Sequence, residues 1–177
     1  MKRLKNRSLQ IIGGFFLIMI GLSFIPYQSA LTFSTQRSNE LIAYTPMSKG
    51  DSFQIIYTHS IHLTDVEESY RVTVEGYIQQ HEMSFDEFGI GMPSSATDDQ
   101  ELVVEEGRYH LKNMNITHPS LPIRIADIVP EQRLVWNDGN QQIWFKDYFV
   151  PRSYITIEIK SLNIWQVLKG VELSEHE

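Results

Sequence analysis

Hydrophobic and polar residues alternate with a two-residue period over most of the chain beyond residue 40. Such alternation is typical of strands that bury one face. The clearest runs cover residues 53–61, 66–74 and 154–159. Shorter runs predict further strands at 41–44, 75–85, 108–111, 122–129, 134–136 and 142–145. Turn-forming residues separate the runs, so the pattern predicts an all-β fold, either a small antiparallel β-sandwich or a barrel-like domain.

The first 27 residues differ, because their apolar residues follow one another without alternation. Four basic residues in the first seven positions precede an uncharged stretch from Ile11 to Tyr27. A helix over that stretch is roughly 26 Å long, close to the ~30 Å hydrocarbon core of a bilayer. Three interpretations stay open, namely an uncleaved single-pass membrane anchor, a cleaved signal peptide and a buried core helix. The basic tail favours the first two, which both place the rest of the chain outside the cytoplasm.

These patterns divide the chain into five parts. We expect a basic cytoplasmic tail at 1–10, a transmembrane anchor or signal segment at 11–27, a polar linker at 28–39 and a β domain at 40–160. The remaining tail, 161–177, has apolar residues near helical spacing, which suggests a short terminal helix. The expected location is the cell membrane, or the exterior if the segment is cleaved.

Composition and charge exclude several classes of function. The 177 residues contain no cysteine, which rules out disulfide scaffolds, cysteine zinc sites and thiol nucleophiles. Net charge is -7, and the part after residue 27 holds 11 basic and 22 acidic residues. So acidic a body repels nucleic acid. Residues 98–106 are strongly acidic, and we interpret them as a solvated loop because they lack the spacing of a calcium loop.

Strand parity places one histidine and one carboxylate on an apolar face. Residues two apart share a face, so His59 falls on the apolar side of 53–61 and Glu68 on that of 66–74. A tight hairpin that aligns both apolar rows sets His59 directly opposite Glu68. This predicted pair is either an internal contact that fixes strand register or the lining of a ligand or partner pocket.

The same parity argues against catalysis and metal binding. Ser60 follows His59 on a strand and faces the other side, so the two cannot form a nucleophile–base pair unless the strand breaks there. The spacing of His59 and His62 also separates their rings, unless the turn redirects His62. We therefore expect no catalytic residue, no metal and no cofactor.

A glycine-containing loop follows the predicted strand 75–85. Gly89 and Gly91 permit positive φ or close backbone approach, and Pro93 ends the strand. The segment is either a tight turn or a surface for a partner, because Phe88, Ile90 and Met92 would otherwise be exposed apolar side chains.

Taken together, these segments resemble the bacterial domain-of-unknown-function family 1850. The resemblance lies in Gly50–Ser60, Val66–Tyr70 and Phe85–Pro93, and it extends over about Leu41 to Ile159. It places seven residues at signature positions, all of them candidates for ligand or partner binding: His59, Ser60, Glu68, Gly89, Gly91, Met92 and Pro93. The acidic 98–106 segment and the tail beyond Lys160 depart from the family pattern.

The resemblance implies a small exported or membrane-anchored accessory protein of a tripartite, TAXI-type solute transporter. From it we expect a non-enzymatic extracytoplasmic domain that contacts the membrane and a transporter permease subunit. The alternative is a small-ligand-binding module that uses a His59/Glu68 pocket under the Gly89–Pro93 loop.

Overall fold

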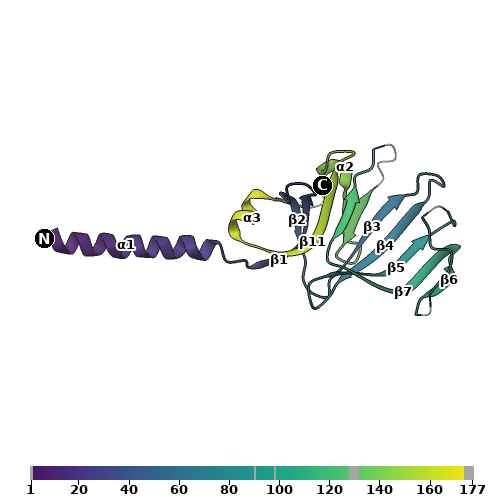
Figure 1. Cartoon of the computed structure of the whole chain (residues 1–177), viewed down its shortest axis with the longest axis horizontal. Coiled ribbons are helices and arrows are strands. Elements are labelled where there is room, and N and C mark those ends of the chain that lie inside the picture. Colours follow the sequence, from purple (N-terminus) through teal and green to yellow (C-terminus); the bar gives the residue numbers. More distant parts are fainter. Residues whose placement is uncertain (1, 90, 98, 128–131, 174–177) are drawn as a thin grey trace.

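Two mainly antiparallel β-sheets pack face to face behind one long N-terminal helix in the computed structural model (Figure 1). The structure describes residues 2–89, 91–97, 99–127 and 132–173, with side chains described from residue 12 onward. The predicted all-β class is confirmed.

The smaller sheet lies nearer the N-terminal helix. Its strand order is β12 (Val171–Glu172), β2 (Leu41–Pro46), β1 (Gln28–Thr35), β11 (Tyr154–Leu162) and β8 (Leu121–Arg124). All pairings are antiparallel except that of β12 with β2.

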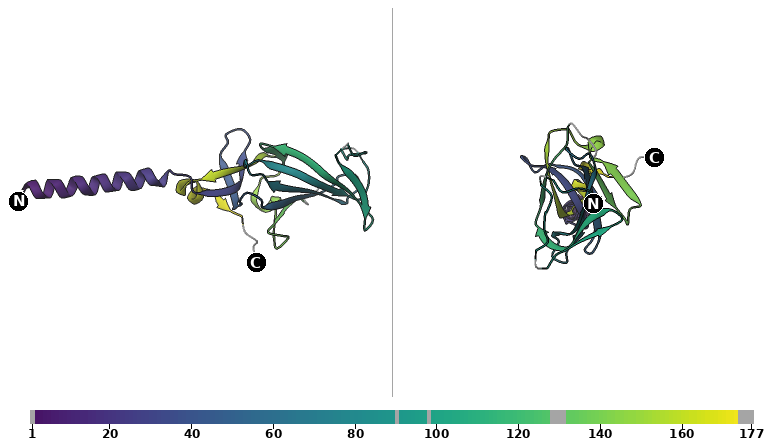
Figure 2. Two further views of the ribbon diagram at one scale, coloured as in Figure 1. Left: turned by 90° about the horizontal axis from the view of Figure 1, so that it is seen from below. Right: turned by 90° about the vertical axis from the view of Figure 1, so that its right-hand side faces the viewer.

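The larger sheet extends away from the helix (Figure 2). Its order is β10 (Gln141–Trp144), β9 (Arg133–Trp136), β3 (Ser52–Thr58), β4 (Asp65–Val72), β5 (Ile78–Phe85), β7 (Arg108–His118) and β6 (Glu101–Glu105). Two short helices complete the fold, α2 (Phe145–Tyr148) and α3 (Ile164–Lys169). The predicted terminal helix is therefore present.

The main core fills the space between the sheets. Phe33 from β1 packs on Phe145 and Phe149, with ring centroids 6.1 and 5.4 Å apart. On the larger sheet, Phe53 stacks on Tyr70, with ring centroids 5.2 Å apart. A second cluster, of Val66, Met83 and Phe85, lies farther out on the same sheet with partly buried neighbours around it: Tyr57, Met92, Leu102, Tyr109 and Met114.

Two segments differ from the sequence predictions. The polar linker predicted at 28–39 is wrong for 28–35, which form β1 at the centre of the smaller sheet. Its polar side chains are buried because they find partners, as Thr32 does by donating to the carbonyl of Glu158 at 2.9 Å. The solvated loop predicted at 98–106 is wrong for 101–105, which form the edge strand β6.

Helix α1 (Lys2–Ser23) projects from the body, and the described apolar side chains along it are exposed (Figures 1 and 2). Among the residues that could be searched, no helix combines the length and the hydropathy needed to cross a membrane.

Candidate functional site

The β3–β4 hairpin has a different register from the predicted one. Ile55 lies opposite Glu68, and the backbone N–H of His59 donates to the carbonyl of Thr64 at 2.8 Å. The predicted contact between His59 and Glu68 is therefore wrong. A shift of four residues leaves every side chain on the same face, so parity could not separate the two registers. The observed register follows from a longer loop, in which Leu63 has a positive φ of 58°.

Glu68 instead forms what we call the acid–tyrosine group, with Tyr57 and Tyr70. The Tyr70 hydroxyl donates to the Glu68 carboxylate at 2.7 Å, and the Tyr57 side chain is also hydrogen-bonded to it. Burial raises the pKa of Glu68, although both tyrosine hydrogen bonds lower it. Burial and the neighbouring carboxylate raise the pKa values of both tyrosines. The group is thus a partly buried acceptor flanked by two phenol donors.

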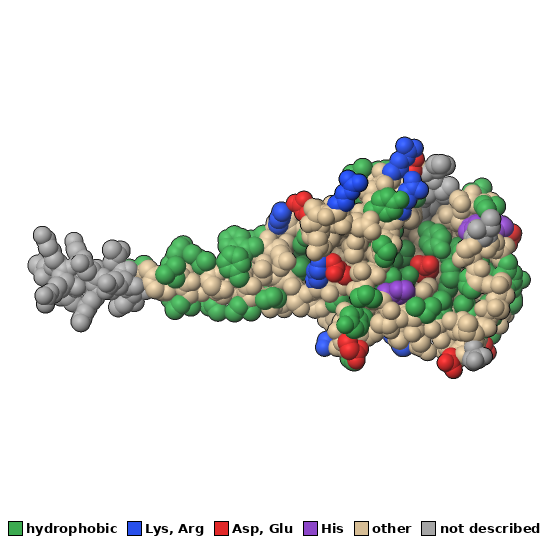
Figure 3. Space-filling model, viewed as in Figure 1, with side chains coloured by type: hydrophobic (Ala, Val, Ile, Leu, Met, Phe, Trp, Pro, Cys, Tyr) green, Lys and Arg blue, Asp and Glu red, His purple; other side chains and the backbone are tan. Residues whose placement is uncertain are grey.

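The acid–tyrosine group lies on the inner face of the larger sheet, between the two apolar clusters. Glu68 is paired with the buried Ile55 on one side and the buried Met83 on the other. Beyond it, β6 and β7 leave Leu102 and Met114 partly exposed on this face. Figure 3 shows hydrophobic side chains gathered over this sheet, with acidic and histidine side chains among them.

His59 begins a loop that brings two imidazoles together. Its Nδ1 accepts from the backbone N–H groups of Ile61 and His62 at 3.3 Å, which leaves Nε2 as the donor nitrogen. The loop turns His62 back, so that the two rings stack with centroids 4.8 Å apart. The expected separation of the rings is therefore wrong, because β3 ends at Thr58 and strand parity stops there.

The glycine loop closes over these imidazoles. A Cβ atom on Gly89 would lie 2.6 Å from Nε2 of His62, so only glycine fits here without displacing that ring. Gly91 has a φ of 91° with open space around it, and the N–H of Met92 donates to the carbonyl of Gly89 at 3.0 Å. Close approach at Gly89, positive φ at Gly91 and a tight turn are thus confirmed.

We call the paired loops, residues 59–64 and 86–93, the motif tip. Nδ1 of His62 lies 2.8 Å from the Glu87 carboxylate, which joins the two loops. Met92 packs inward against the second apolar cluster and Pro93 is partly buried. Ile90 lies outside the described residues.

The motif tip also exposes apolar side chains. Ile61 is 62% exposed, Leu63 67% and Phe88 42%. The ring of Phe88 nevertheless lies against Tyr109, with centroids 4.3 Å apart. In Figure 1 the tip lies at the end of the body remote from α1.

An ionic network holds the base of the tip. The Arg108 side chain contacts Glu67, the Asp86 carboxylate at 2.7 Å and the carbonyl of Asp65 at 2.7 Å. Arg133 in turn lies 2.6 Å from the Asp65 carboxylate. These contacts join the ends of β4, β5, β7 and β9, and so fix the strands that carry both loops.

Ser60 points to a different part of the surface. It is exposed, and it lines a cavity of about 650 Å³ together with Thr58, Arg124 and Arg152. Ser60 and His59 are thus not brought together as a nucleophile and its base. Arg152 is already paired with Asp127 at 2.5 Å.

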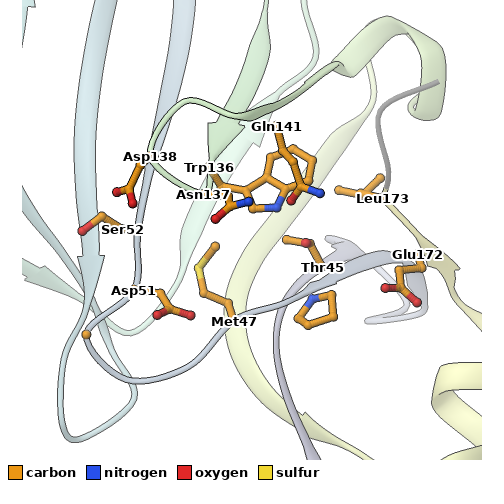
Figure 4. A pocket seen from close by; sticks show the side chains of 12 residues that line it. Thr45, Met47, Asp51, Ser52, Trp136, Asn137, Asp138, Gln141, Glu172 and Leu173 are labelled. Carbon is orange, nitrogen blue, oxygen red and sulfur yellow. The ribbon is translucent and has the colours of Figure 1, made fainter. Parts of the chain in front are cut away.

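A second cavity, of about 500 Å³, lies where the β2–β3 loop, the β9–β10 turn and β12 converge. Figure 4 shows Met47 and Trp136 near its centre, with the carboxylates of Asp51 and Asp138 on one side and Glu172 on the other. Two of these acids have internal partners, since Asp51 accepts from the N–H of Ser48 and Glu172 from the Tyr44 hydroxyl. The cavity contains none of the seven candidate residues. Within the described residues, no three histidine, aspartate or glutamate side chains are grouped so that they could hold a metal ion.

Comparison with known proteins gives one match. The model of a family described as Domain of unknown function (DUF1850) matches residues 53–143. The chain belongs to this family. Searches of curated proteins and of solved structures found no match.

The DUF1850 match covers the candidate site and little of the smaller sheet. It runs from within β3 to within β10, and so includes the motif tip and the acid–tyrosine group. Four strands of the smaller sheet, β1, β2, β11 and β12, lie outside it.

Four site residues were not predicted from the sequence. Tyr57 and Tyr70 share the predicted face with Glu68, and that parity is the signal that could have identified them as its partners. Strand parity predicts that the His62 ring lies apart from that of His59, because it does not encode how the loop turns. No sequence signal marks Glu87 as the partner of His62.

Proposed function

We propose that this DUF1850 protein is a non-enzymatic, membrane-tethered extracytoplasmic domain that binds a component of a solute transporter through its motif tip. The observation that carries the proposal is the meeting of two signature loops around stacked imidazoles, with exposed apolar side chains beside them.

Tethering is supported by the N-terminal sequence. The segment from Ile11 to Tyr27 carries no charge and follows four basic residues, whereas the body is acidic. The positive-inside rule then favours a cytoplasmic N-terminus and an external body. In α1, Phe16 and Leu17 are 65% and 69% exposed, which is costly in water and favourable in lipid.

Contact through the motif tip is supported by its surface and by its rigidity. Exposed Ile61, Leu63 and Phe88 supply apolar area, while the polar groups of His62 and Glu87 are paired with each other. Apolar side chains on a rigid support are typical of protein interfaces. Because the tip is remote from α1, its partner must have an extracytoplasmic part.

The family resemblance supports the choice of a solute transporter as the partner. It implies an accessory role beside a TAXI-type tripartite transporter, which has a membrane permease and an external solute-binding protein. Either component would offer an extracytoplasmic surface to the tip.

Affinity purification of the full chain from detergent-solubilised native membranes tests the proposal. Leu63→Asp should reduce recovery of the permease or binding protein at least about tenfold, which corresponds to ~1.4 kcal/mol of binding free energy. Val150→Asp is the matched control, since Val150 is 73% exposed and lies outside the tip. Absence of both transporter components from the unmodified sample, or equal losses in the two variants, would contradict the proposal.

A second candidate function is the binding of a small ligand on the inner face, and the acid–tyrosine group favours it. Glu68 is an acceptor on an apolar sheet face, beside two aromatic rings. That combination suits an apolar molecule with an amine group, which would meet both a carboxylate and ring faces.

Thermal stabilisation of the full chain by phenethylamine, with phenethyl alcohol as the uncharged control, tests this second function. The amine should stabilise the native protein more than the alcohol does, and Glu68→Gln should abolish the difference. Equal effects of the two compounds on the native protein would rule out recognition by Glu68.

A further inference from the structure

The side of the body next to α1 carries an apolar surface that the proposed function does not use. After α1 ends at Ser23, Phe24, Ile25 and Tyr27 are 59%, 55% and 61% exposed. Four exposed apolar residues from the other end of the chain lie at the same side, on α3 and β12: Ile164, Trp165, Leu168 and Val171. We call these seven residues the collar.

The two parts of the collar meet at Trp165 and Phe24. Trp165 Nε1 donates to the Ser23 hydroxyl at 2.8 Å, and the Trp165 ring lies 6.3 Å from that of Phe24. Both ribbon views place α3 beside the end of α1 (Figures 1 and 2). The apolar surface of α1 therefore continues without a break onto the body.

Helix α3 is held with its apolar side outward. Asn163 and Gln166 form reciprocal capping hydrogen bonds of 3.0 Å, which fix the start of the helix. Val167 packs inward against Leu162 and Tyr44. The helical period then turns Trp165 to the opposite side, while Ile164 and Leu168, on the two flanks, remain 43% and 73% exposed.

We infer that the collar lies in the interfacial layer of the bilayer that α1 enters, so that the body rests on the membrane surface. This inference rests on the tethering part of the proposed function. Tryptophan and tyrosine next to an apolar helix are the residues that concentrate at membrane interfaces.

The charges beside the collar identify the kind of lipid. Lys169 lies 3.0 Å from the Glu40 carboxylate, and Lys160 is paired with Glu158. Because both lysines are already neutralised, attraction to anionic headgroups adds little. We therefore expect the collar to bind zwitterionic lipid by apolar burial.

Tryptophan fluorescence in vesicles tests the inference. The full chain is reconstituted in phosphatidylcholine vesicles, with or without lipid that carries a nitroxide quencher at the interface. Quenching should remove about half or more of the Trp165 emission, because the ring lies at the depth of the label. Trp165→Phe should abolish that loss, whereas Trp144→Phe, on the larger sheet, should preserve it.

Two further measurements separate the alternatives. Leu168→Asp should weaken quenching without unfolding the body, and adding anionic lipid should leave quenching unchanged. If the protein floats with the vesicles but Trp165 is not quenched, the contact of the collar with the membrane is contradicted, whereas tethering through α1 is supported. If the protein does not float with the vesicles, both the membrane tether and the inference about the collar are contradicted. If quenching falls as the protein-to-lipid ratio rises, a second copy covers the surface instead of lipid.

Discussion

Replacement of Gly89 by alanine tests how closely the two signature loops are joined. The added Cβ would lie 2.6 Å from Nε2 and 3.1 Å from Cδ2 of His62. Ordinary contact between such atoms needs about 3.5 Å, so the imidazole must move by ~1 Å. That ring is held by stacking on His59 and by its 2.8 Å contact with Glu87. No backbone strain adds to this, since the φ of Gly89 lies outside the left-handed range.

The cost can be worked from those two contacts. Loss of favourable ring stacking costs about 0.5–1.5 kcal/mol. Glu87 is largely exposed, so weakening its contact with His62 adds about 0–1 kcal/mol. We expect Gly89→Ala to lower the free energy of unfolding by about 1–2 kcal/mol, within the range for overpacked sites. Urea unfolding of the full chain in mild detergent, followed by tryptophan fluorescence, measures it.

A double-mutant cycle decides whether His62 is the cause. In a His62→Ala background the obstacle is gone, so Gly89→Ala should cost less than about 0.5 kcal/mol. Gly91→Ala is the matched control, because its cost of about 1–2 kcal/mol comes from positive φ and should be the same in both backgrounds. An undiminished cost of Gly89→Ala without His62 would refute the reasoning.

Three further predictions concern the acid–tyrosine group, the ionic network and the core. Burial raises the pKa of Glu68 above its ordinary 4.5, so its protonated form stabilises the fold at low pH and that stabilisation is lost as pH rises. The free energy of unfolding of the native protein minus that of Glu68→Gln should therefore fall as pH rises above 4.5 in urea titrations, and a rise would contradict this prediction. Arg108→Met should lower the free energy of unfolding by about 1–2 kcal/mol in the same assay, because two carboxylates lose their cationic partner. An unchanged urea midpoint would show that the ionic network does not stabilise the fold. Phe145→Ala should lower the free energy of unfolding by about 3–5 kcal/mol, since the ring is fully buried between two phenylalanines. A decrease below about 1 kcal/mol would contradict the position of Phe145 in the core.

Strand periodicity was sufficient to predict most of the sheets. It located approximately nine of the twelve strands found in the described residues, because burial of one face leaves a two-residue pattern. It missed β1 because Thr32 and Ser34 are buried there with polar side chains, so both faces of the strand are covered and the alternation disappears. It missed β6 because Leu102, Val103 and Val104 are consecutive, so this edge strand shows no alternation.

The site was predicted in part, and the errors have two causes. Parity correctly put Glu68 on the inner face, and glycine geometry correctly marked Gly89 and Gly91. Strand register depends on the length of the loop, which hydrophobic pattern does not encode when the shift is an even number of residues. For this reason the sequence paired Glu68 with His59 instead of with the tyrosines. It left His62 outside the site because β3 ends at Thr58 and strand parity does not extend into the loop.

Photo-crosslinking from the motif tip tests the central claim most directly. A photoreactive amino acid is placed at Leu63 or, as a control, at Val150, in the full chain in its native membranes. The account predicts a crosslink from position 63 to the permease or the solute-binding protein of a transporter, and none from position 150. Identical products from the two positions, or a well-folded protein that yields no transporter crosslink from position 63, would contradict it.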